Sequence, residues 1–434
     1  MVFFYPFLMF IYSGVFKSLY VYYGINPIVS FLMYLIVVSY HFLYLYIPVD
    51  IYKKLKLDIV WLPFLMVAFE CLKSTLFGGM PVGNLNILVY DIPFFIRPSS
   101  YFGSYFVTLS LLFLPLSFYL ILQKRHIGYF IIAFFAVFMF LPNENIIDSH
   151  KETISVVQGN IPQNQKWDRS YLDKNLHIYL KESSKVKSGV VFWPESSYPY
   201  LFEEDNNELV GFVKNKKNIA LVVGVVRIKN DKYFNSIALI KKNNINYYDK
   251  QKLVPFAEFI PYRSILGKFI PKSLDPGDFI KGKRNIILPY KDLKIGAMVC
   301  YEEAFSDISR KYKNMGANLL AILTNDAWFD KTPTFYMLHR NAIFRAVENN
   351  VWVVRVANTG ISEIIAPNGK IYAKLENDTR DVLNRNLIIT ESLPTFFDRY
   401  GYLFCLFLMI FVSLLIFYRI DKLRKGKESN REAI

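Results

Sequence analysis

The stretch Leu293-Lys294-Ile295-Gly296-Ala297-Met298-Val299-Cys300-Tyr301-Glu302-Glu303 joins a mostly apolar run to an abrupt polar turn. The apolar run predicts a buried strand, and the residues after it predict the start of a helix. A lone thiol therefore stands at a strand-to-helix elbow. Upstream, Glu195 follows the strand-like run 190–194, and Lys250 precedes the run 253–258. The chain thus offers a carboxylate, an ammonium and a thiol in that order.

These three groups suit nucleophilic catalysis. A thiol near neutral pH is mostly protonated and attacks poorly until a base takes its proton or a nearby cation lowers its pKa. Glu195 is a candidate base, and Lys250 is a candidate cation for the thiolate and for the oxyanion that forms when a thiol adds to a carbonyl. The alternative for Cys300 is a small buried hydrophobe, the role that we assign to Cys71 and Cys405 in their apolar segments.

Strand-like and helix-like segments alternate between residues 150 and 395. Strands are expected at 154–157, 190–193, 219–228, 236–240, 294–299 and 319–323. The clearest helices are expected at 171–185, 306–314 and 339–348, and Gly316 is expected to stop the second. Strands that alternate with helices predict a layered α/β domain.

Short motifs occur through this region in a characteristic order. They are Gln158-Gly159-Asn160-Ile161-Pro162-Gln163, Lys166-Trp167, Trp193-Pro194-Glu195, Lys250-Gln251-Lys252-Leu253-Val254-Pro255-Phe256, Cys300-Tyr301-Glu302, Asn325-Asp326-Ala327-Trp328-Phe329, His339, Arg345-Ala346-Val347-Glu348 and Arg355-Val356-Ala357-Asn358-Thr359-Gly360-Ile361-Ser362. In this order the set closely resembles the apolipoprotein N-acyltransferases, a membrane-embedded family of the nitrilase superfamily. The resemblance covers about residues 150 to 395 and, more loosely, the apolar segments on either side.

The resemblance implies an α-β-β-α sandwich whose reactive residues sit at strand ends. It implies Glu195 as general base and acid, Lys250 as stabiliser of the oxyanion and thiolate, and Cys300 as nucleophile. Glu258 matches a second carboxylate that orients the lysine or assists proton transfer. No metal and no organic cofactor is implied.

Trp167, Tyr301 and Glu302 match further positions that are important in the family. The alternative for Trp167 is a core or surface aromatic, and for Tyr301 and Glu302 it is a hydrogen-bonded pair at a strand end. A scaffold role is expected for a larger set: Asn325, Trp328, Arg345, Arg355, Asn358 and Ser362.

The resemblance fails at Ala257 and Asp330, where the family usually has glycine. Glycine is often kept where φ must be positive, so both turns are expected to differ slightly from the family's. Family members commonly carry about two more N-terminal spans, and this chain starts at what resembles their third.

The composition predicts a membrane protein, because 53% of the residues are hydrophobic and 17% are aromatic. Six spans are expected, at about 2–22, 25–47, 58–77, 101–122, 126–142 and 400–418. The third carries Glu70 and Lys73 near its end. This pair either snorkels to the interface or makes a polar contact in a substrate cleft. The first span lacks an early basic region and a cleavage site, so no removable signal peptide is expected.

Four regions follow from this pattern: an N-terminal membrane domain (1–145), a catalytic domain (150–395), a C-terminal span (400–418) and a basic tail (419–434). Short basic clusters follow the second, fourth and last spans, and with six spans all fall on one side. They are Lys53, Lys54 and Lys56; Lys124 and Arg125; and Arg419, Lys422, Arg424, Lys425 and Lys427. That side is expected to be cytoplasmic, which places the catalytic domain on the periplasmic face of an inner membrane.

The net charge of +15 does not indicate nucleic-acid binding, because no nucleic-acid motif accompanies it. Solvated surface and contact with anionic headgroups explain the excess. The three cysteines lie in different regions and do not suggest a disulfide framework. A monomer is expected.

The expected reaction is ping-pong acyl transfer from a membrane phospholipid, through a Cys300 thioester, to the α-amino group of a diacylglyceryl-modified cysteine of an apolipoprotein. Two alternatives remain open from the sequence. A membrane-bound nitrilase-like amidase would use the same three residues with water as acceptor. A transporter or scaffold could carry an inactive enzyme domain, although Glu195, Lys250 and Cys300 are all present.

Overall fold

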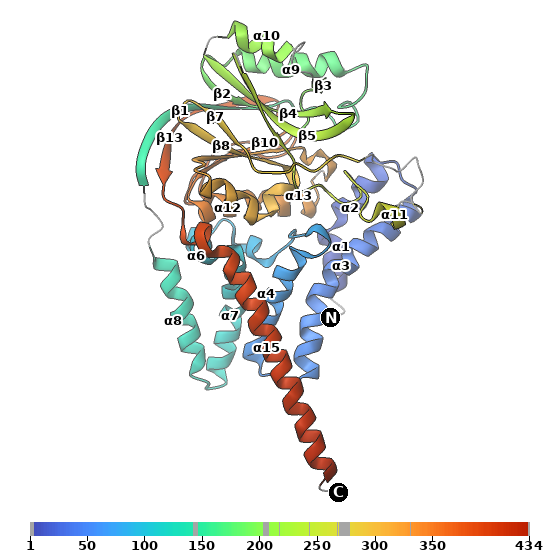
Figure 1. The fold of residues 1–434 in the computed structure, drawn as a ribbon, viewed down its shortest axis with the longest axis vertical. Helices are drawn as coiled ribbons and strands as arrows, with labels where there is room; N and C mark the ends of the chain where they lie inside the picture. The colour runs from blue at the N-terminus through green and yellow to red at the C-terminus, as the bar shows by residue number, and fades with distance from the viewer. Residues whose placement is uncertain are drawn as a thin grey trace.

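The computed structural model describes residues 4–141, 146–202, 208–216, 218–242, 244–266, 268, 278–329 and 331–432. An α/β domain occupies one end of the molecule, and a helical region extends from it (Figure 1). The predicted strands and helices of the α/β domain are present, with one difference. The helix predicted over 339–348 is divided at Arg340 into α13 (Pro333–His339) and α14 (Asn341–Asn349).

Two sheets form the centre of the α/β domain in the part of the chain that is described. In spatial order, the first contains β13 (Asp381–Ser392), β1 (Ile146–Gln158), β2 (Gly189–Phe192), β4 (Ile219–Lys229), β5 (Lys232–Lys241) and β6 (Asn244–Asp249), with β3 (Leu201–Phe202) paired to β4. The second contains β12 (Ile371–Leu375), β11 (Ser362–Ile365), β10 (Trp352–Ala357), β9 (Leu319–Thr324), β8 (Leu293–Val299) and β7 (Ile287–Tyr290). Strands β1, β2 and β4 are parallel, and so are β8, β9 and β10.

The sheets pack face to face through alternating side chains. Val190 and Phe192 of β2 share a core with Ile295 of β8, whereas Val191 and Trp193 point to the opposite face. Helices cover both outer faces: α9 (Leu172–Ser184) and α10 (Glu208–Asn215) on the first sheet, and α12 (Ser306–Asn314), α13 and α14 on the second (Figure 1). The predicted α-β-β-α sandwich is therefore confirmed.

The helical region is built from segments at both ends of the chain. Outside residues 74–103, its elements are α1 (Phe4–Ile11), α2 (Ser13–Lys17), the π-helix η1 (Ser18–Tyr22), α3 (Pro27–Lys54), η2 (Ile59–Trp61), α4 (Leu62–Lys73), α7 (Ser104–Leu122), α8 (Ile127–Phe140) and α15 (Phe396–Glu432). Residues 74–103, here called the junction segment, contain the short helices η3 (Leu76–Gly78), η4 (Leu85–Val89), α5 (Pro93–Ile96) and α6 (Ser99–Phe102). This segment connects α4 to α7 where the helical region meets the α/β domain (Figure 1).

The predicted membrane spans are matched in part. Within the described ranges, α3, α7 and α15 are long and apolar enough to cross a membrane. Helix α1 and the continuous helix formed by α2 and η1 make a bent pair with an angle of 49°, and they give a fourth span if the pair crosses as one. Helix α4 has 12 residues and α8 has 14, fewer than the roughly 20 that a span needs. The spans predicted there stay predictions. Helix α15 continues beyond the predicted C-terminal span into the predicted basic tail and ends at Glu432.

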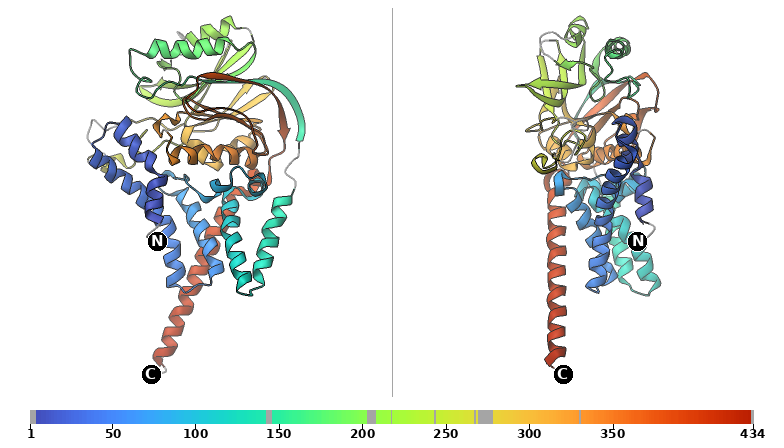
Figure 2. Two further views of the ribbon diagram at one scale, coloured as in Figure 1. Left: turned by 180° about the vertical axis from the view of Figure 1, so that it is seen from behind. Right: turned by 90° about the vertical axis from the view of Figure 1, so that its right-hand side faces the viewer.

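The three basic clusters lie at the end of the helical region farthest from the α/β domain. Arg125 pairs with Asp58 at 3.0 Å, which joins the loop before α8 to the loop after α3. Arg419 of α15 donates hydrogen bonds to the carbonyl oxygens of Leu55 and Lys56. Both views in Figure 2 show this end pointing away from the sheets.

Cys71 of α4 and Cys405 of α15 form a disulfide, with Cα atoms 5.8 Å apart. The prediction that these cysteines are unpaired hydrophobes was wrong. They are 334 positions apart in the sequence, and only the packing of α15 against α4 brings them together. Cys300 is a free, half-buried thiol.

Candidate active site

Cys300 sits directly after β8, at the start of the 3-10 helix η6 (Cys300–Ala304), so the predicted strand-to-helix elbow is confirmed. Its φ is 48°, in the left-handed region that non-glycine residues adopt rarely. Such a conformation persists only where the surrounding contacts hold it. Glu302 and Tyr301 make contacts of this kind.

The buried carboxylate of Glu302 fastens the elbow to a neighbouring segment. One oxygen accepts a hydrogen bond from the backbone N–H of Val299 at 2.8 Å. The other accepts from the N–H groups of Gln251 (2.7 Å) and Lys252 (3.0 Å) and from the Tyr248 hydroxyl (2.8 Å). The nucleophile's elbow is thereby tied to the segment after β6 that carries the predicted lysine.

The predicted carboxylates and lysine meet in one buried cluster. Lys250 Nζ lies 3.0 Å from Glu258 Oε1 and 3.5 Å from Glu195 Oε1. Asn235 Nδ2 lies 2.8 Å from the same oxygen of each carboxylate. The backbone N–H of Asn325 donates to the second oxygen of Glu195 at 3.1 Å. Glu195 is thus held from both sheets.

Burial and the charges of this cluster shift the pKa of the Cys300 thiol. Burial raises the pKa of its thiol, the negative charge of Glu195 raises it further, and Lys250 and a hydrogen bond with Thr324 lower it. Burial lowers the pKa of Lys250, but Glu258 and Glu195 outweigh that effect and hold the pKa above its ordinary value. At neutral pH the lysine is charged and the thiol is protonated, so attack by the thiol requires a base.

Two polar residues near the carboxylates were not singled out from the sequence. Asn235 is a buried amide inside the otherwise mostly apolar strand β5, and this is the signal that could have identified it. Lys166 Nζ donates to the carbonyl oxygen of Glu195 at 2.9 Å, and burial lowers the pKa of Lys166 to about 8. Its neighbour Trp167 is 48% exposed, and its role stays a prediction.

A glycine allows the Glu195 turn to approach the first sheet closely. A Cβ atom at Gly224 of β4 would lie 2.5 Å from the Cα of Glu195 and 2.4 Å from the carbonyl oxygen of Pro194. The backbone N–H of Ser197 donates to the Gly224 carbonyl at 2.9 Å. Any larger residue at 224 would push the carboxylate out of the cluster.

A buried network of ion pairs also holds the elbow. Arg355 contacts both oxygens of Glu303 at 2.8 and 3.0 Å and both oxygens of Asp326 at 2.8 and 3.0 Å. This joins η6 to the loop after β9. The contacts fit the predicted scaffold role of Arg355, since a buried charge is tolerated when it is fully paired.

Other predicted scaffold residues also make structural contacts. Asn358 bonds to both backbone groups of Ile161. Ser362 donates to Gln158 at 2.7 Å. Arg345 pairs with Glu348 of the same helix at 2.7 Å.

Trp328, for which a scaffold role is also expected, packs against the helical region. Its ring stacks on Tyr23 at a centroid distance of 5.0 Å and contacts Tyr22 edge-on at 6.0 Å. Burial raises the pKa of Tyr23 to about 12, and the charges of Glu258 and Glu195 contribute to that rise. The N-terminal segment therefore reaches the edge of the candidate site.

The junction segment contacts the elbow directly. The hydroxyl of Tyr301 donates to the carbonyl oxygen of Gly79 at 2.8 Å. Gly79 has a φ of +85°, and a Cβ there would lie 2.1 Å from the carbonyl oxygen of Ser74, so only glycine fits this turn. The residue after the candidate nucleophile is thus anchored to the helical region.

Glu70 and Lys73 hold the same segment, so the snorkelling interpretation of this pair was wrong. Both are buried. Lys73 Nζ donates to the carbonyl oxygen of Val82 at 3.2 Å, and Glu70 accepts from the N–H of Leu85 at 3.1 Å. Their charged groups therefore form hydrogen bonds with backbone groups of the junction segment.

The positions that depart from the family pattern have different outcomes. Ala257 does not have a positive φ, whereas its neighbour Phe256 does, at 64°. The turn therefore accommodates a Cβ at 257. Asp330 lies outside the described residues.

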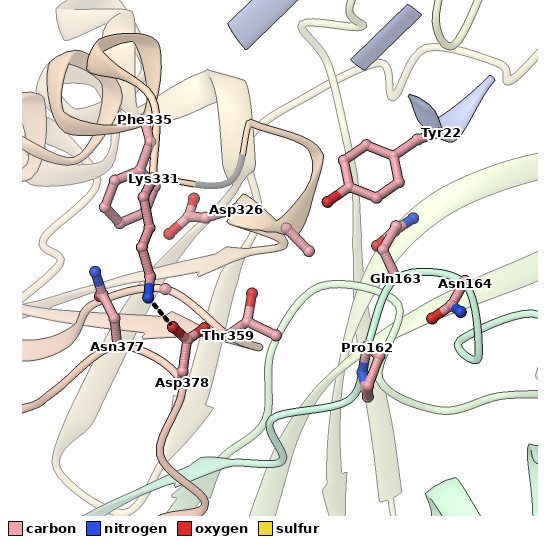
Figure 3. Close-up of a pocket in the computed structure, with 12 residues that line it drawn as sticks. Tyr22, Pro162, Gln163, Asn164, Asp326, Lys331, Phe335, Thr359, Asn377 and Asp378 are labelled. Carbon is pink, nitrogen blue, oxygen red and sulfur yellow. Dashed lines mark ion pairs between the residues drawn. The ribbon is translucent and has the colours of Figure 1, made fainter. Parts of the chain in front are cut away.

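A pocket with both polar and apolar walls, of about 210 Å³, lies beside the cluster (Figure 3). Its walls come from loops after β1, β9, β10 and β12, from α13 and from η1. Glu195, Lys250 and Cys300 do not line it. Because β8, β9 and β10 are neighbouring parallel strands, the pocket lies next to the elbow at the same sheet edge.

Comparison with known proteins defines the class of this fold and site. Residues 153–390 match the carbon-nitrogen hydrolase family, and residues 1–117 match the apolipoprotein N-acyltransferase N-terminal domain. The class is a carbon-nitrogen hydrolase domain joined to an apolar helical region. The chain is 30% identical over 385 residues to the apolipoprotein N-acyltransferase of Rickettsia bellii, covering 82% of this chain and 74% of that protein. It belongs to the apolipoprotein N-acyltransferase family.

Two other relatives show how much of the length is shared. The apolipoprotein N-acyltransferase of Geobacter metallireducens is 36% identical over 265 residues, which is 58% of this chain and 50% of that protein. The one from Aquifex aeolicus is 28% identical over 372 residues, which is 83% of each. The chain thus aligns with about half the length of the first relative and most of the second.

Proposed function

We propose that this protein transfers a fatty acyl chain from a membrane phospholipid to the α-amino group of the S-diacylglyceryl cysteine of apolipoproteins. The observation that carries the proposal is the hydrogen bond between Tyr301 and Gly79. It attaches a Cys-Glu-Lys site of the carbon-nitrogen hydrolase type to an apolar helical region. Such an attachment suits two substrates that are both anchored in a lipid layer.

The first half-reaction forms the acyl-enzyme. Glu195 takes the proton of the Cys300 thiol, and the sulfur attacks an ester carbonyl of the phospholipid. The ammonium of Lys250 stabilises the oxyanion. The intermediate collapses, the leaving lysophospholipid oxygen takes the proton from Glu195, and a thioester remains on Cys300.

The second half-reaction forms the amide. The neutral α-amine of the diacylglyceryl cysteine attacks the thioester carbonyl, and Glu195 accepts a proton from the amine. The intermediate expels the sulfur of Cys300, which regains the proton. Base, cation and nucleophile are all side chains, so these steps use neither a metal nor an organic cofactor.

Glu258 and Asn235 position the reacting groups in this scheme. Glu258 accepts a hydrogen bond from Lys250, and Asn235 donates to Glu195 and Glu258. These bonds limit where the ammonium and the carboxylate can move. Tyr301 and Glu302 hold the elbow of Cys300. A role for Trp167 at the entrance of the site completes the set that the family resemblance implies.

We place the protein in the inner membrane as a multi-pass monomer, with the α/β domain on the periplasmic face. Two observations support this orientation. The basic clusters gather at the opposite end, as expected for the cytoplasmic side. The disulfide joins α4 and α15 near the α/β domain, where an oxidising compartment would preserve it.

The proposed reaction is tested with purified full-length enzyme, labelled phospholipid and a synthetic diacylglyceryl lipopeptide. The enzyme is expected to acquire a hydroxylamine-sensitive label and to pass it to the peptide amine, detected by mass spectrometry. Release of free fatty acid with no amide product would show an amidase-type hydrolase instead. In cells, loss of the gene is expected to leave lipoprotein N-termini without the amide-linked chain.

The proposed orientation has a separate test. Single cysteines placed at exposed positions in the loop after α3, the loop before α8, the α/β domain and the end of α15 are probed with a membrane-impermeant thiol reagent. Cys71, Cys300 and Cys405 are replaced first. Only the reporter in the α/β domain is expected to react in cells with a permeabilised outer barrier. Labelling of the end of α15 would reverse the orientation.

A further inference from the structure

The pocket beside the catalytic cluster is formed jointly by the helical region and the α/β domain. Tyr22 of η1 forms one wall, and Thr359, Asn377 and Asp378 lie across from it (Figure 3). Phe335 of α13 closes another side. A carbon-nitrogen hydrolase domain without the helical region would lack the Tyr22 wall, so the pocket belongs to the membrane-attached form of the site.

Short hydrogen-bonded links connect the pocket to the general base. Gln163 lines the pocket and accepts a hydrogen bond from the side chain of Asn325 at 2.8 Å. The backbone N–H of Asn325 donates to Glu195 at 3.1 Å. A ligand that contacts Gln163 would therefore be linked through two residues, Gln163 and Asn325, to the carboxylate that handles the proton of the acceptor amine.

The chemistry of the walls argues against an anionic headgroup. Two carboxylates, Asp326 and Asp378, line the pocket. The ammonium of Lys331 is paired with Asp378 at 2.7 Å (Figure 3). Asp326 is paired with Arg355, so a phosphate would meet no unpaired cation among the described residues of the walls. A volume below the roughly 300 Å³ of common small-molecule pockets also disfavours an acyl chain.

The amide side chains in the walls suit a polypeptide backbone. Gln163, Asn164 and Asn377 each carry both a donor and an acceptor, the complement of a peptide unit. The side-chain oxygen of Asn377 is buried and has no hydrogen-bond partner among the residues that the structure describes. A buried acceptor without a partner costs free energy, and a peptide N–H would remove that cost after the Asn377 side chain turns toward the pocket.

We propose that this pocket binds the polypeptide of the acceptor, namely the first residues after its lipid-modified cysteine. The inference rests on the proposed function and adds the part of the acceptor that the enzyme recognises. The diacylglyceryl chains stay with the helical region, the amine faces Cys300, and the peptide leaves between Tyr22 and Asn377. Recognition is through the backbone, so it tolerates many sequences.

The test compares two synthetic acceptors with the full-length enzyme: S-diacylglyceryl cysteine amide, and the same lipid-modified cysteine followed by four polar residues. In the Asn377→Leu variant, kcat/KM for the longer acceptor is expected to fall roughly three- to tenfold, the range for one lost neutral hydrogen bond. The cysteine amide is expected to react as with wild type. Asn377→Gln keeps an amide and is expected to recover part of the loss.

Acyl-enzyme formation from phospholipid, measured in the same variants, separates the two proposals. It is expected to be unchanged in Asn377→Leu. The matched control is Asn384→Leu, at an exposed position of β13, which is expected to match wild type with both acceptors.

Two results would overturn the pocket assignment alone: an equal loss for both acceptors, or no loss for either. Slower acyl-enzyme formation with normal acceptor use would assign the pocket to the phospholipid headgroup and likewise overturn it. A wild-type enzyme that forms no acyl-enzyme from phospholipid would overturn the proposed function as well.

Discussion

The α/β domain and the helical region differ in the kinds of partner that their buried charges have. In the α/β domain, Arg355 pairs with the carboxylates of Glu303 and Asp326, and Glu302 accepts from backbone N–H groups. In the helical region, Glu70 and Lys73 bond to backbone groups of the junction segment. An unpaired buried charge is costly in both settings, so each region satisfies its charges with the partners available.

This difference indicates a division of roles. In the proposed mechanism, the α/β domain carries the reacting groups, and hydrogen bonds and ion pairs hold them in place. The helical region contributes backbone contacts, such as the Gly79 carbonyl, and aromatic walls, such as Tyr22 and Tyr23. Reactivity should therefore be lost most severely by changes in the first region and be modulated by changes in the second.

The largest effect is expected for the nucleophile. Cys300→Ala is expected to abolish both the hydroxylamine-sensitive acyl-enzyme and the amide product, because no other described residue offers a thiol to the cluster. The double variant Cys71→Ala, Cys405→Ala is the control and is expected to keep the acyl-enzyme. Substantial turnover by Cys300→Ala would remove Cys300 from the mechanism.

The next largest effect is expected for the charges around it. Glu195→Gln keeps the shape of the side chain without the base, and Lys250→Met keeps most of the stem without the charge. Each is expected to slow single-turnover acylation roughly a hundredfold or more. A rate near wild type in either variant would contradict the role of that residue.

Tyr301→Phe sharpens the comparison, because it removes one contact between the two regions. Loss of its hydrogen bond to Gly79 is expected to slow acylation about fivefold, the size of one net hydrogen bond. Its pH profile is expected to keep the wild-type shape, since the base and the lysine are untouched. The control is Tyr336→Phe, at a partly exposed ring outside the cluster. A fall as large as that of Lys250→Met would show that Tyr301 takes part in the chemistry.

The smallest effect on activity is expected for the disulfide. Replacing Cys71 and Cys405 by alanine is expected to change turnover at 25 °C less than twofold and to lower the midpoint of thermal unfolding by several degrees, since the link closes a loop of 334 positions. Thermal unfolding with and without a reducing agent checks this. An unchanged midpoint in the variant, together with three alkylatable thiols instead of one in the denatured, unreduced wild type, would show that the bond does not form.

Local patterns identified much of the fold. Strand-like runs of four to ten residues located the central strands, and the apolar-to-polar switch after Val299 located the elbow. The spans were less well predicted, because the hydropathy of 58–77 does not reveal that α4 ends at Lys73 and that the chain then turns into the junction segment. The partners of Glu70 and Lys73 come from that turn.

The sequence by itself determined the three candidate reactive groups, their order, the layered α/β domain around them and the presence of apolar helices, because each depends on residues that are close together in the chain. Only the tertiary structure decided the pairing of Cys71 with Cys405, the bridge of Asn235 to Glu195 and the anchoring of Tyr301 on Gly79. Each of these joins segments 40 or more positions apart. Such contacts arise from packing geometry, which short-range spacing does not record.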